Sequence, residues 1–285
     1  MAYGTKTANI MDVPLSVSSV FAPYVGDNGY KWDGANSVRV LSVANGSLAD
    51  YNESSATAPM GSPTLVVPDE QVLTLAYNKS MLLRIQRTQI QDIPVSSFSK
   101  TVAMQQADEV FVPTHDAYSL AKVFAARPSG NVVAYDSGRK DLGLKTMVDT
   151  ARTGGASVNS LVTWVTYTLA ADIGDAINYT GSEAGFTQGR NGYLGKVAGV
   201  STIEVPDDYF FAGVHAITAD KRAIVNVTPK MDPKNGGMTV IDPVPLFSGI
   251  EIQLRDRADT FVLNKKARTV ATLETAASTT TTTTA

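Results

Sequence analysis

In residues 71–87, QVLTLAYNKSMLLRIQR, every second side chain from Leu73 to Ile85 is apolar except Lys79, and the side chains between them are mostly polar. A period of two is typical of a β-strand with one covered face. Strands in globular proteins usually have about 3–10 residues, whereas this stretch would extend roughly 55 Å at about 3.3 Å per residue. A compact domain of 285 residues is only about 50 Å across. The apolar face of so long a strand therefore needs a surface to cover it.

The residues before this stretch predict its partner strand. Residues 37–43, SVRVLSV, read as a short strand, and residues 44–70 are rich in Gly, Pro, Ser and Asn. We therefore predict an extended β-hairpin over residues 36–90. An isolated two-stranded hairpin is marginally stable in water, so it must pack on something.

Two surfaces could cover the apolar face, namely a sheet of the same chain or an adjacent copy of it. We predict the adjacent copy, since burying even half of these side chains would contribute several kcal/mol at about 1.5–3 kcal/mol each, before ordering costs. The predicted intersubunit contact residues are Leu73, Leu75, Tyr77, Lys79, Met81, Leu83 and Ile85.

The composition limits the function classes. A hydrophobic content of 44% is enough for a large core, and a net charge of −3 lacks the basic footprint of a nucleic-acid reader. The chain has no cysteine, and its first residues do not resemble a secretory signal. The most apolar segment, residues 160–174, is too short and too rich in Thr to span a membrane. We expect a soluble chain made in the cytosol.

The remaining pattern predicts an α+β fold. Helical spacing runs over about 92–110 and 114–126, with Pro113 between, so one kinked helix or two collinear helices would fit. Asp141 can begin a further helix that ends at Gly154-Gly155. Further expectations are a buried strand at 160–167, a helical stripe at 169–177, a strand at 193–205, a hairpin at 216–229, and closing strands at 246–257, 260–263 and 268–274.

No set of residues predicts catalysis or metal binding. The two histidines, His115 and His215, cannot form a site of the His/Cys kind, and we expect His115 at the surface or capping a helix. Residues 189–197, GRNGYLGKV, differ in spacing from a phosphate-binding loop. The acidic groups at 106–109 and 206–208 fit solvated surface positions better than acid–base chemistry. We expect no enzyme activity, no catalytic residue, no metal and no cofactor.

The order of arm, long hairpin, long helix, mixed α/β middle and returning strands resembles the major capsid proteins of tailed bacteriophages, which have the Hong Kong ninety-seven fold. Three segments add to the resemblance. VFVPTHDAYSLAKVFA (110–125) is similar to the family's spine helix through Pro113, Asp116, Tyr118 and Lys122. GRNGYLGKVAGVSTIEVPDDYF (189–210) resembles the axial-domain strand through Gly195, Val197, Gly199 and Ile203. Residues 249–274 resemble the closing strands, and the similarity covers roughly residues 30–275.

The resemblance implies a domain plan. It comprises an N-terminal arm (1–35), the extended hairpin (36–90), a peripheral domain with the spine helix (91–130), an axial domain (131–236), closing peripheral strands (237–275) and a Thr-rich tail (276–285). It also implies self-assembly as hexamers and pentamers into an icosahedral virion shell that encloses double-stranded DNA without sequence-specific binding. Assembly would take place in the cytoplasm of the bacterial host, with a portal and possibly a decoration protein. Because only about 35 residues precede the hairpin, we expect a separate scaffolding protein or none.

Three other functions stay open at this point. An encapsulin-like compartment would share the fold and carry enzyme cargo instead of a genome. A surface or carbohydrate-binding protein would use the Thr run as a linker, although the missing secretory signal argues against it. An enzyme of unknown type is the least supported, because the sequence lacks the motifs above.

Overall fold

A computed structural model shows the fold of the chain. It describes residues 18–26, 28–30, 32, 37–43, 48–54, 60–61, 65–90, 95–171, 173, 193–227, 237–242, 244 and 248–275. The α-helices are α1 (Arg87–Ile90), α2 (Val95–Gln106), α3 (Val112–Ala125) and α4 (Lys140–Thr153). Shorter helical turns are η1 (Ala22–Tyr24), η2 (Ala107–Phe111), η3 (Ser129–Asn131), η4 (Val158–Ser160), η5 (Asp207–Tyr209) and η7 (Asn264–Thr269).

The strands are β1 (Ser37–Val43), β2 (Pro68–Thr74), β3 (Tyr77–Gln86), β4 (Val132–Ala134), β5 (Leu161–Thr166), β6 (Tyr193–Val197), β7 (Val200–Val205), β8 (Val214–Asp220), β9 (Ile224–Val227), β10 (Met238–Ile241), β11 (Gly249–Val262) and β12 (Ala271–Glu274). Helices and strands occur in one chain with mixed sheets, so the predicted α+β class is confirmed.

The chain forms two compact units. One unit is Tyr30–Thr74, and the other consists of Met1–Gly29 and Leu75–Ala285. In the smaller unit, β1 and β2 pair antiparallel from Ser37 opposite Thr74 to Val43 opposite Pro68. We call this unit the hairpin, and the larger unit the main body.

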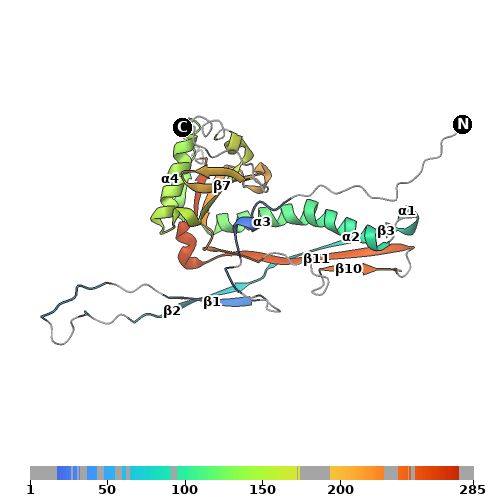
Figure 1. The fold of residues 1–285 in the computed structure, drawn as a ribbon, viewed down its shortest axis with the longest axis horizontal. Coiled ribbons are helices and arrows are strands. Elements are labelled where there is room, and N and C mark those ends of the chain that lie inside the picture. The colour runs from blue at the N-terminus through green and yellow to red at the C-terminus, as the bar shows by residue number, and fades with distance from the viewer. Residues whose placement is uncertain are drawn as a thin grey trace, which may run out of the picture. The chain divides into compact units, whose positions relative to one another are not determined.

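A continuous helix lies along the long strand β11 in the main body (Figure 1). The π-helical turn η2 joins α2 to α3, and Pro113 stands in the first turn of α3, where a missing N–H costs least. Of the two arrangements predicted around Pro113, the structure has the single long helix. On the helix side, Ile250, Ile252 and Leu254 of β11 form a core with Ala103 and Phe111.

Strand β11 is a single strand of 14 residues. It pairs antiparallel with β3 and with β10, and its last residues pair with β9. The prediction of separate strands at 246–257 and 260–263 is therefore wrong. The predicted hairpin at 216–229 is also wrong, since β8 belongs to a different sheet from β9.

A six-stranded sheet in the order β4-β12-β8-β5-β7-β6 forms the second part of the main body. All six residues of β5 are buried, as the sequence predicted for this strand. Its residues alternate between two cores: Leu161 and Val165 pack with α4, whereas Val162 and Trp164 pack with α3 and with Phe21. The last strand, β12, lies in this sheet and not beside β11.

Other predictions fall partly on described residues. Helix α4 begins at Lys140 and is followed by Gly154-Gly155, close to the predicted bounds. Residues 167–171 and 173 are helical, with Leu169 and Ile173 buried, whereas the rest of the predicted stripe to 177 lies outside the described residues. The Thr-rich tail (276–285) and residues 1–17 of the arm also lie outside them.

Candidate functional site

The described residues contain no cluster of three or more His, Cys, Asp or Glu side chains that could hold a metal. None of their helices is long and apolar enough to cross a membrane. His215 stacks on Tyr135 with ring centroids 3.9 Å apart and shares a hydrogen bond of 2.7 Å with the Thr275 hydroxyl. Its environment is that of a packed side chain, and burial lowers its pKa.

His115 is buried, so the expectation of a surface or capping residue is wrong. Its ring meets Tyr77 edge to face, with centroids 5.6 Å apart, and burial lowers its pKa. In the sequence, His115 is a helical residue beside Asp116, and this position did not indicate that tyrosines and strands would cover its side chain.

Asp116, one of the four spine-helix residues, anchors the segment before the hairpin. Its carboxylate accepts hydrogen bonds from the Ser19 hydroxyl at 2.7 Å and from the Val20 N–H at 2.8 Å. Burial raises its pKa to about 6, against the lowering effect of these bonds. The next residue, Phe21, is fully buried and stacks on Trp164 with centroids 5.1 Å apart. Asp116 therefore holds a strap, residues 19–26, against the core.

The other spine-helix residues have structural surroundings. The Tyr118 hydroxyl donates to Asp259 at 3.0 Å, and burial raises the Tyr118 pKa. The Lys122 ammonium lies 5.2 Å from the centre of the Tyr118 ring. With Pro113 in the first turn of α3, all four residues shape or anchor the long helix, and the structure brings them to one element.

A second group of buried polar atoms lies between α3 and β11, and the sequence gave no signal for it. Both carboxylate oxygens of Asp256, the Tyr77 hydroxyl and His115 Nε2 lack a protein hydrogen-bond partner. Burial raises the pKa of Asp256 to about 6, and burial together with the Asp256 charge raises that of Tyr77 to about 12. Lys79 stands opposite Asp256 in the β3–β11 register, yet its ammonium lies 6.0 Å from the centre of the Tyr77 ring and forms no ion pair with Asp256 among the described residues.

The axial-strand residues form a tight hairpin. Gly195 lies at an irregularity in the β6–β7 pairing and has φ of +125°. Ala198 and Gly199 turn the chain between the strands with φ of +52° and +80°. Val197 and Ile203 pack into cores on the sheet. The predicted single strand at 193–205 is thus two strands, and these four residues set their turn and packing.

The strand predicted to contact a neighbouring copy is divided between the two units. Residues 75–76 separate β2 from β3, and β3 pairs with β11 over its whole length. Met81, Leu83 and Ile85 pack on the core beneath the long helix, while Tyr77 and Leu73 are buried. The premise that this face has no core in its own chain is wrong for β3, and the hairpin is shorter than predicted. An intersubunit role for Leu73, Leu75, Tyr77, Lys79, Met81, Leu83 and Ile85 stays a prediction.

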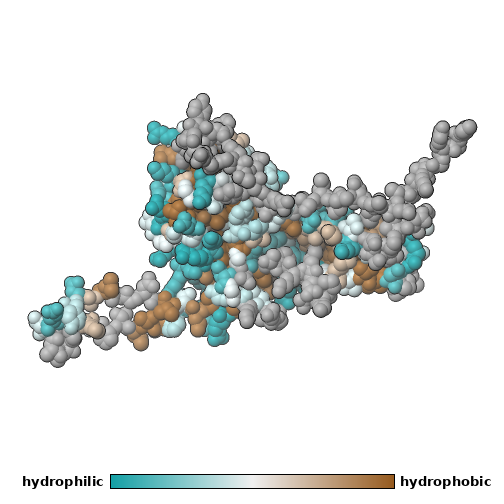
Figure 2. Space-filling model, in the orientation of Figure 1, coloured by the Kyte–Doolittle hydropathy of each residue, from teal (hydrophilic) through white to brown (hydrophobic). Residues whose placement is uncertain are grey.

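The hairpin instead exposes a different apolar set. Leu41, Val43 and Val72 lie on one face of the β1–β2 pair and are 55–64% exposed. An ion pair between Arg39 and Glu70, at 2.8 Å, lies on the same face. Further large apolar side chains are exposed nearer the tip, namely Leu48, Tyr51, Met60, Leu65, Val66 and Val67. Figure 2 shows hydrophobic residues on the surface along both strands. We call these nine residues the exposed apolar set. Their apolar side chains could be seen in the sequence, but the prediction of the contact residues followed the more regular alternation of residues 71–87.

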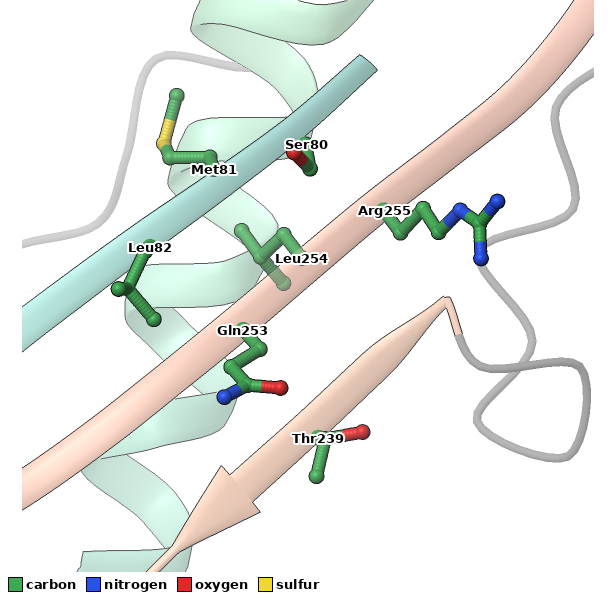
Figure 3. A pocket seen from close by; sticks show the side chains of 7 residues that line it. All are labelled: Ser80, Met81, Leu82, Thr239, Gln253, Leu254 and Arg255. Carbon is green, nitrogen blue, oxygen red and sulfur yellow. The ribbon is translucent and has the colours of Figure 1, made fainter. Parts of the chain in front are cut away.

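A shallow pocket of about 340 Å³ lies on the four-stranded sheet of β3, β9, β10 and β11, lined by residues of β3, β10 and β11 (Figure 3). Its polar groups are engaged along the sheet: the Gln253 amide donates to Glu251 at 2.7 Å, and Arg255 donates to Asn78 at 3.0 Å. The Ser80 and Thr239 hydroxyls also line the pocket, but its lining includes no His, Cys, Asp, Glu or Lys. Its remaining lining residues are Ser80, Met81, Leu82, Thr239 and Leu254.

The whole chain is similar to solved structures from phages. The capsid structure of the cyanophage P-SCSP1u matches with a TM-score of 0.68 and 13% identity, covering 97% of this chain and 94% of that chain. A structure from Mycobacterium phage Cain matches with a TM-score of 0.65 and 14% identity, covering 96% and 95%. The asymmetric unit of the bacteriophage PhiM1 mature capsid matches with a TM-score of 0.59 and 13% identity, covering 97% and 91%.

No protein-family model and no curated protein matches the sequence. At such low identity the structural matches establish the fold. The chain has the fold of these capsid proteins from end to end, and the Hong Kong ninety-seven-like fold predicted from the sequence is confirmed.

Proposed function

We propose that this protein is the major capsid protein of a tailed bacteriophage, and that it assembles as hexamers and pentamers into an icosahedral shell around double-stranded DNA. The observation that carries the proposal is the reciprocal coverage of 91–97% with two phage capsid structures. A shared core alone would leave large parts of one chain unmatched, whereas here nearly the whole length of both chains is covered.

The exposed apolar set supports self-assembly independently of that likeness. Soluble monomers rarely expose contiguous apolar surface of this extent without a binding role. Burying Leu41, Val43 and Val72 at about 1.5–3 kcal/mol each would contribute several kcal/mol per contact before ordering costs. Repeated around a closed symmetric shell, contacts of this size give a durable assembly. The hairpin of one subunit therefore covers its apolar face on a neighbouring subunit.

The proposed function has consequences for partners and place. The shell forms in the cytoplasm of the host bacterium and becomes part of the virion, together with a portal. A separate scaffolding protein and a decoration protein are further proposed partners. The chain itself has no enzyme activity in this proposal, in keeping with the structural surroundings of its buried His and Asp side chains.

Assembly of the purified protein tests the proposal. The chain is produced alone and together with a scaffolding protein from the same phage, then separated by size-exclusion chromatography and viewed by negative-stain microscopy. Closed icosahedral particles are expected in at least one of the two preparations. A folded monomer in both preparations would contradict the proposal.

The contents of particles from infected cells distinguish a virion from an enzyme compartment with the same fold. Absorbance at 260 nm and mass spectrometry of purified particles identify the cargo. Double-stranded DNA supports the proposal, whereas a single enriched enzyme without nucleic acid would show an encapsulin-like compartment.

A further inference from the structure

The strands of the six-stranded sheet begin and end along two opposite edges of the sheet, and the loops at these two edges differ in charge. Strands β5 and β7 are parallel, so Thr166 and Val205 end at the same edge of the sheet. Strand β8 is antiparallel to β5 and pairs Asp220 with Leu161, so it ends at the opposite edge. Strand β12 is also antiparallel to β8 and begins beside the end of β8. The loops at each edge therefore come from fixed strand ends of one rigid sheet.

The first edge is acidic and aromatic. Asp207 and Asp208 follow β7 and are exposed, and the Asp207 carboxylate accepts hydrogen bonds from the Thr168 hydroxyl and N–H. Phe211 is 53% exposed, and its ring contacts that of Phe124 in a tilted arrangement with centroids 5.1 Å apart. We call Asp207, Asp208 and Phe211 the acidic edge.

Among the described residues, Arg127, Arg139 and Lys140 are cations to consider at this end of the sheet. Arg127 lies over the ring of Phe124, but its guanidinium donates to both oxygens of Glu274 at 2.7 and 3.1 Å. Arg139 and Lys140 lie at the start of α4, which follows β4. Since β4 is the far edge strand, three strands lie between it and β7. These three cations therefore do not neutralise Asp207 and Asp208.

The opposite edge is basic. Lys221 follows β8, and the turn η7 carries Lys266 and Arg268 just before β12; all three are exposed. The Lys266 ammonium donates to the Arg222 carbonyl at 3.0 Å, which ties η7 to the β8 loop. The acids nearby are already matched by arginines, Asp220 by Arg222 and Asp149 by Arg152. We call Lys221, Lys266 and Arg268 the basic edge.

We infer that copies of this chain associate head to tail, with the acidic edge of one copy against the basic edge of the next. The partner is a second copy because both complementary surfaces belong to one rigid body, and because two like edges would repel each other. Such a contact is heterologous, so repeating it generates a ring when the rotation closes. Phe211 supplies apolar area at the centre of the contact, where exposed ion pairs alone would give little affinity. The inference deepens the proposed function, since the ring is the building unit of the shell.

A charge exchange tests this pairing. One variant carries Asp207→Lys and Asp208→Lys, a second carries Lys221→Glu and Lys266→Glu, and a third carries all four substitutions. Each double variant is expected to lower the yield of sedimenting rings and particles at least ten-fold, and the quadruple variant to recover most of it. Because the two doubles change net charge in opposite directions, a common loss cannot come from net charge. Thermal melts of each subunit check that it folds.

Milder variants keep the test valid if a reversal disturbs folding. Asp207→Asn with Asp208→Asn removes the charge only, and should make assembly weaker and less sensitive to salt, since Debye screening acts on exposed charges. Wild-type yields from both doubles, or a folded quadruple variant as defective as the doubles, would overturn the inference. In either case the wild-type particles would leave the proposed function standing, whereas a wild-type chain that forms no particles would contradict that function.

Discussion

Gly154 shows how a single residue can depend on a distant part of the chain. A Cβ at this position would lie 2.2 Å from the carbonyl oxygen and 2.8 Å from the carbonyl carbon of Arg268. Both are backbone atoms and cannot rotate away. We expect Gly154→Ala to lower the free energy of unfolding by about 2–3 kcal/mol, in the range of overpacked cores. Urea unfolding measures the change.

The matched control is Gly130→Ala, where an added Cβ meets nothing within 4 Å. That variant should be neutral or gain up to about 1 kcal/mol. Equal stabilities of the two variants would contradict the close approach of Gly154 to η7. The sequence predicted Gly154-Gly155 as a helix stop, and Gly155 with φ of +93° fits that reason. The contact with Arg268 could not be predicted, since it joins positions more than a hundred residues apart.

Asp256 makes stability depend on pH in the direction opposite to most carboxylates. Its folded pKa of about 6 lies above the unfolded value near 3.9, so folding favours the protonated form. Stability from this group is greatest below pH 4 and is lost as pH rises through 6. We expect Asp256→Asn to raise the free energy of unfolding at pH 7.5 by about 1–2 kcal/mol and to change it little at pH 4.5.

Tyr77 and Lys79 of β3 lie next to Asp256, and the rings of His115 and Tyr118 of α3 contact the Tyr77 ring. The matched control is Asp208→Asn, which makes the same substitution at an exposed carboxylate and is measured at both pH values. Urea unfolding at both pH values measures the difference. A pH dependence identical in Asp256→Asn and the parent protein would show that Asp256 titrates normally.

At the scale of elements, local patterns in the sequence predicted elements well and their partners badly. Alternation found β3 and the buried strand β5, and the apolar spacing found the long helix and α4. The partner of β3 is β11, more than 160 positions along the chain, and a period of two says only that one face is covered. The sequence therefore left β3 without a core and assigned its face to a neighbouring subunit. The same limitation placed β8 and β9 in one hairpin, because a short turn signal does not show that the second strand joins another sheet.

The strap, residues 19–26, has the role that was hardest to expect from patterns in the sequence. Phe21 fills a fully buried place against Trp164, whose indole N–H donates to the Val20 carbonyl at 3.2 Å. We expect Phe21→Ala to cost about 3–5 kcal/mol, as for other buried aromatic truncations. Trp164 should also become more accessible to a fluorescence quencher. Urea unfolding and iodide quenching measure the two effects.

The same truncation at an exposed phenylalanine provides the comparison. Phe211→Ala should cost about 1 kcal/mol, because it removes one ring contact with Phe124 and little burial. If Phe21→Ala were as mild as Phe211→Ala, the strap would not be part of the core. Such an outcome would also remove the reason for Asp116 to be buried.

At the scale of the whole molecule, the division into two units separates folding from assembly. The main body contains the three cores that hold the helices to the sheets, and the hairpin lies outside all of them. Deleting residues 45–69 and joining the ends by a short turn should therefore leave the melting temperature of the main body unchanged. The same deletion removes most of the exposed apolar set, so the subunits should fail to close shells.

Replacing residues 45–69 by a Gly/Ser segment of equal length is the matched control for chain length, and it should fail in the same way because flexible polar residues supply no apolar surface. Calorimetry measures the first expectation, and sedimentation with negative-stain microscopy measures the second. Normal particles from the deletion variant would show that the hairpin tip contributes nothing to the shell, and particles from the Gly/Ser variant alone would show that its length matters and its apolar residues do not.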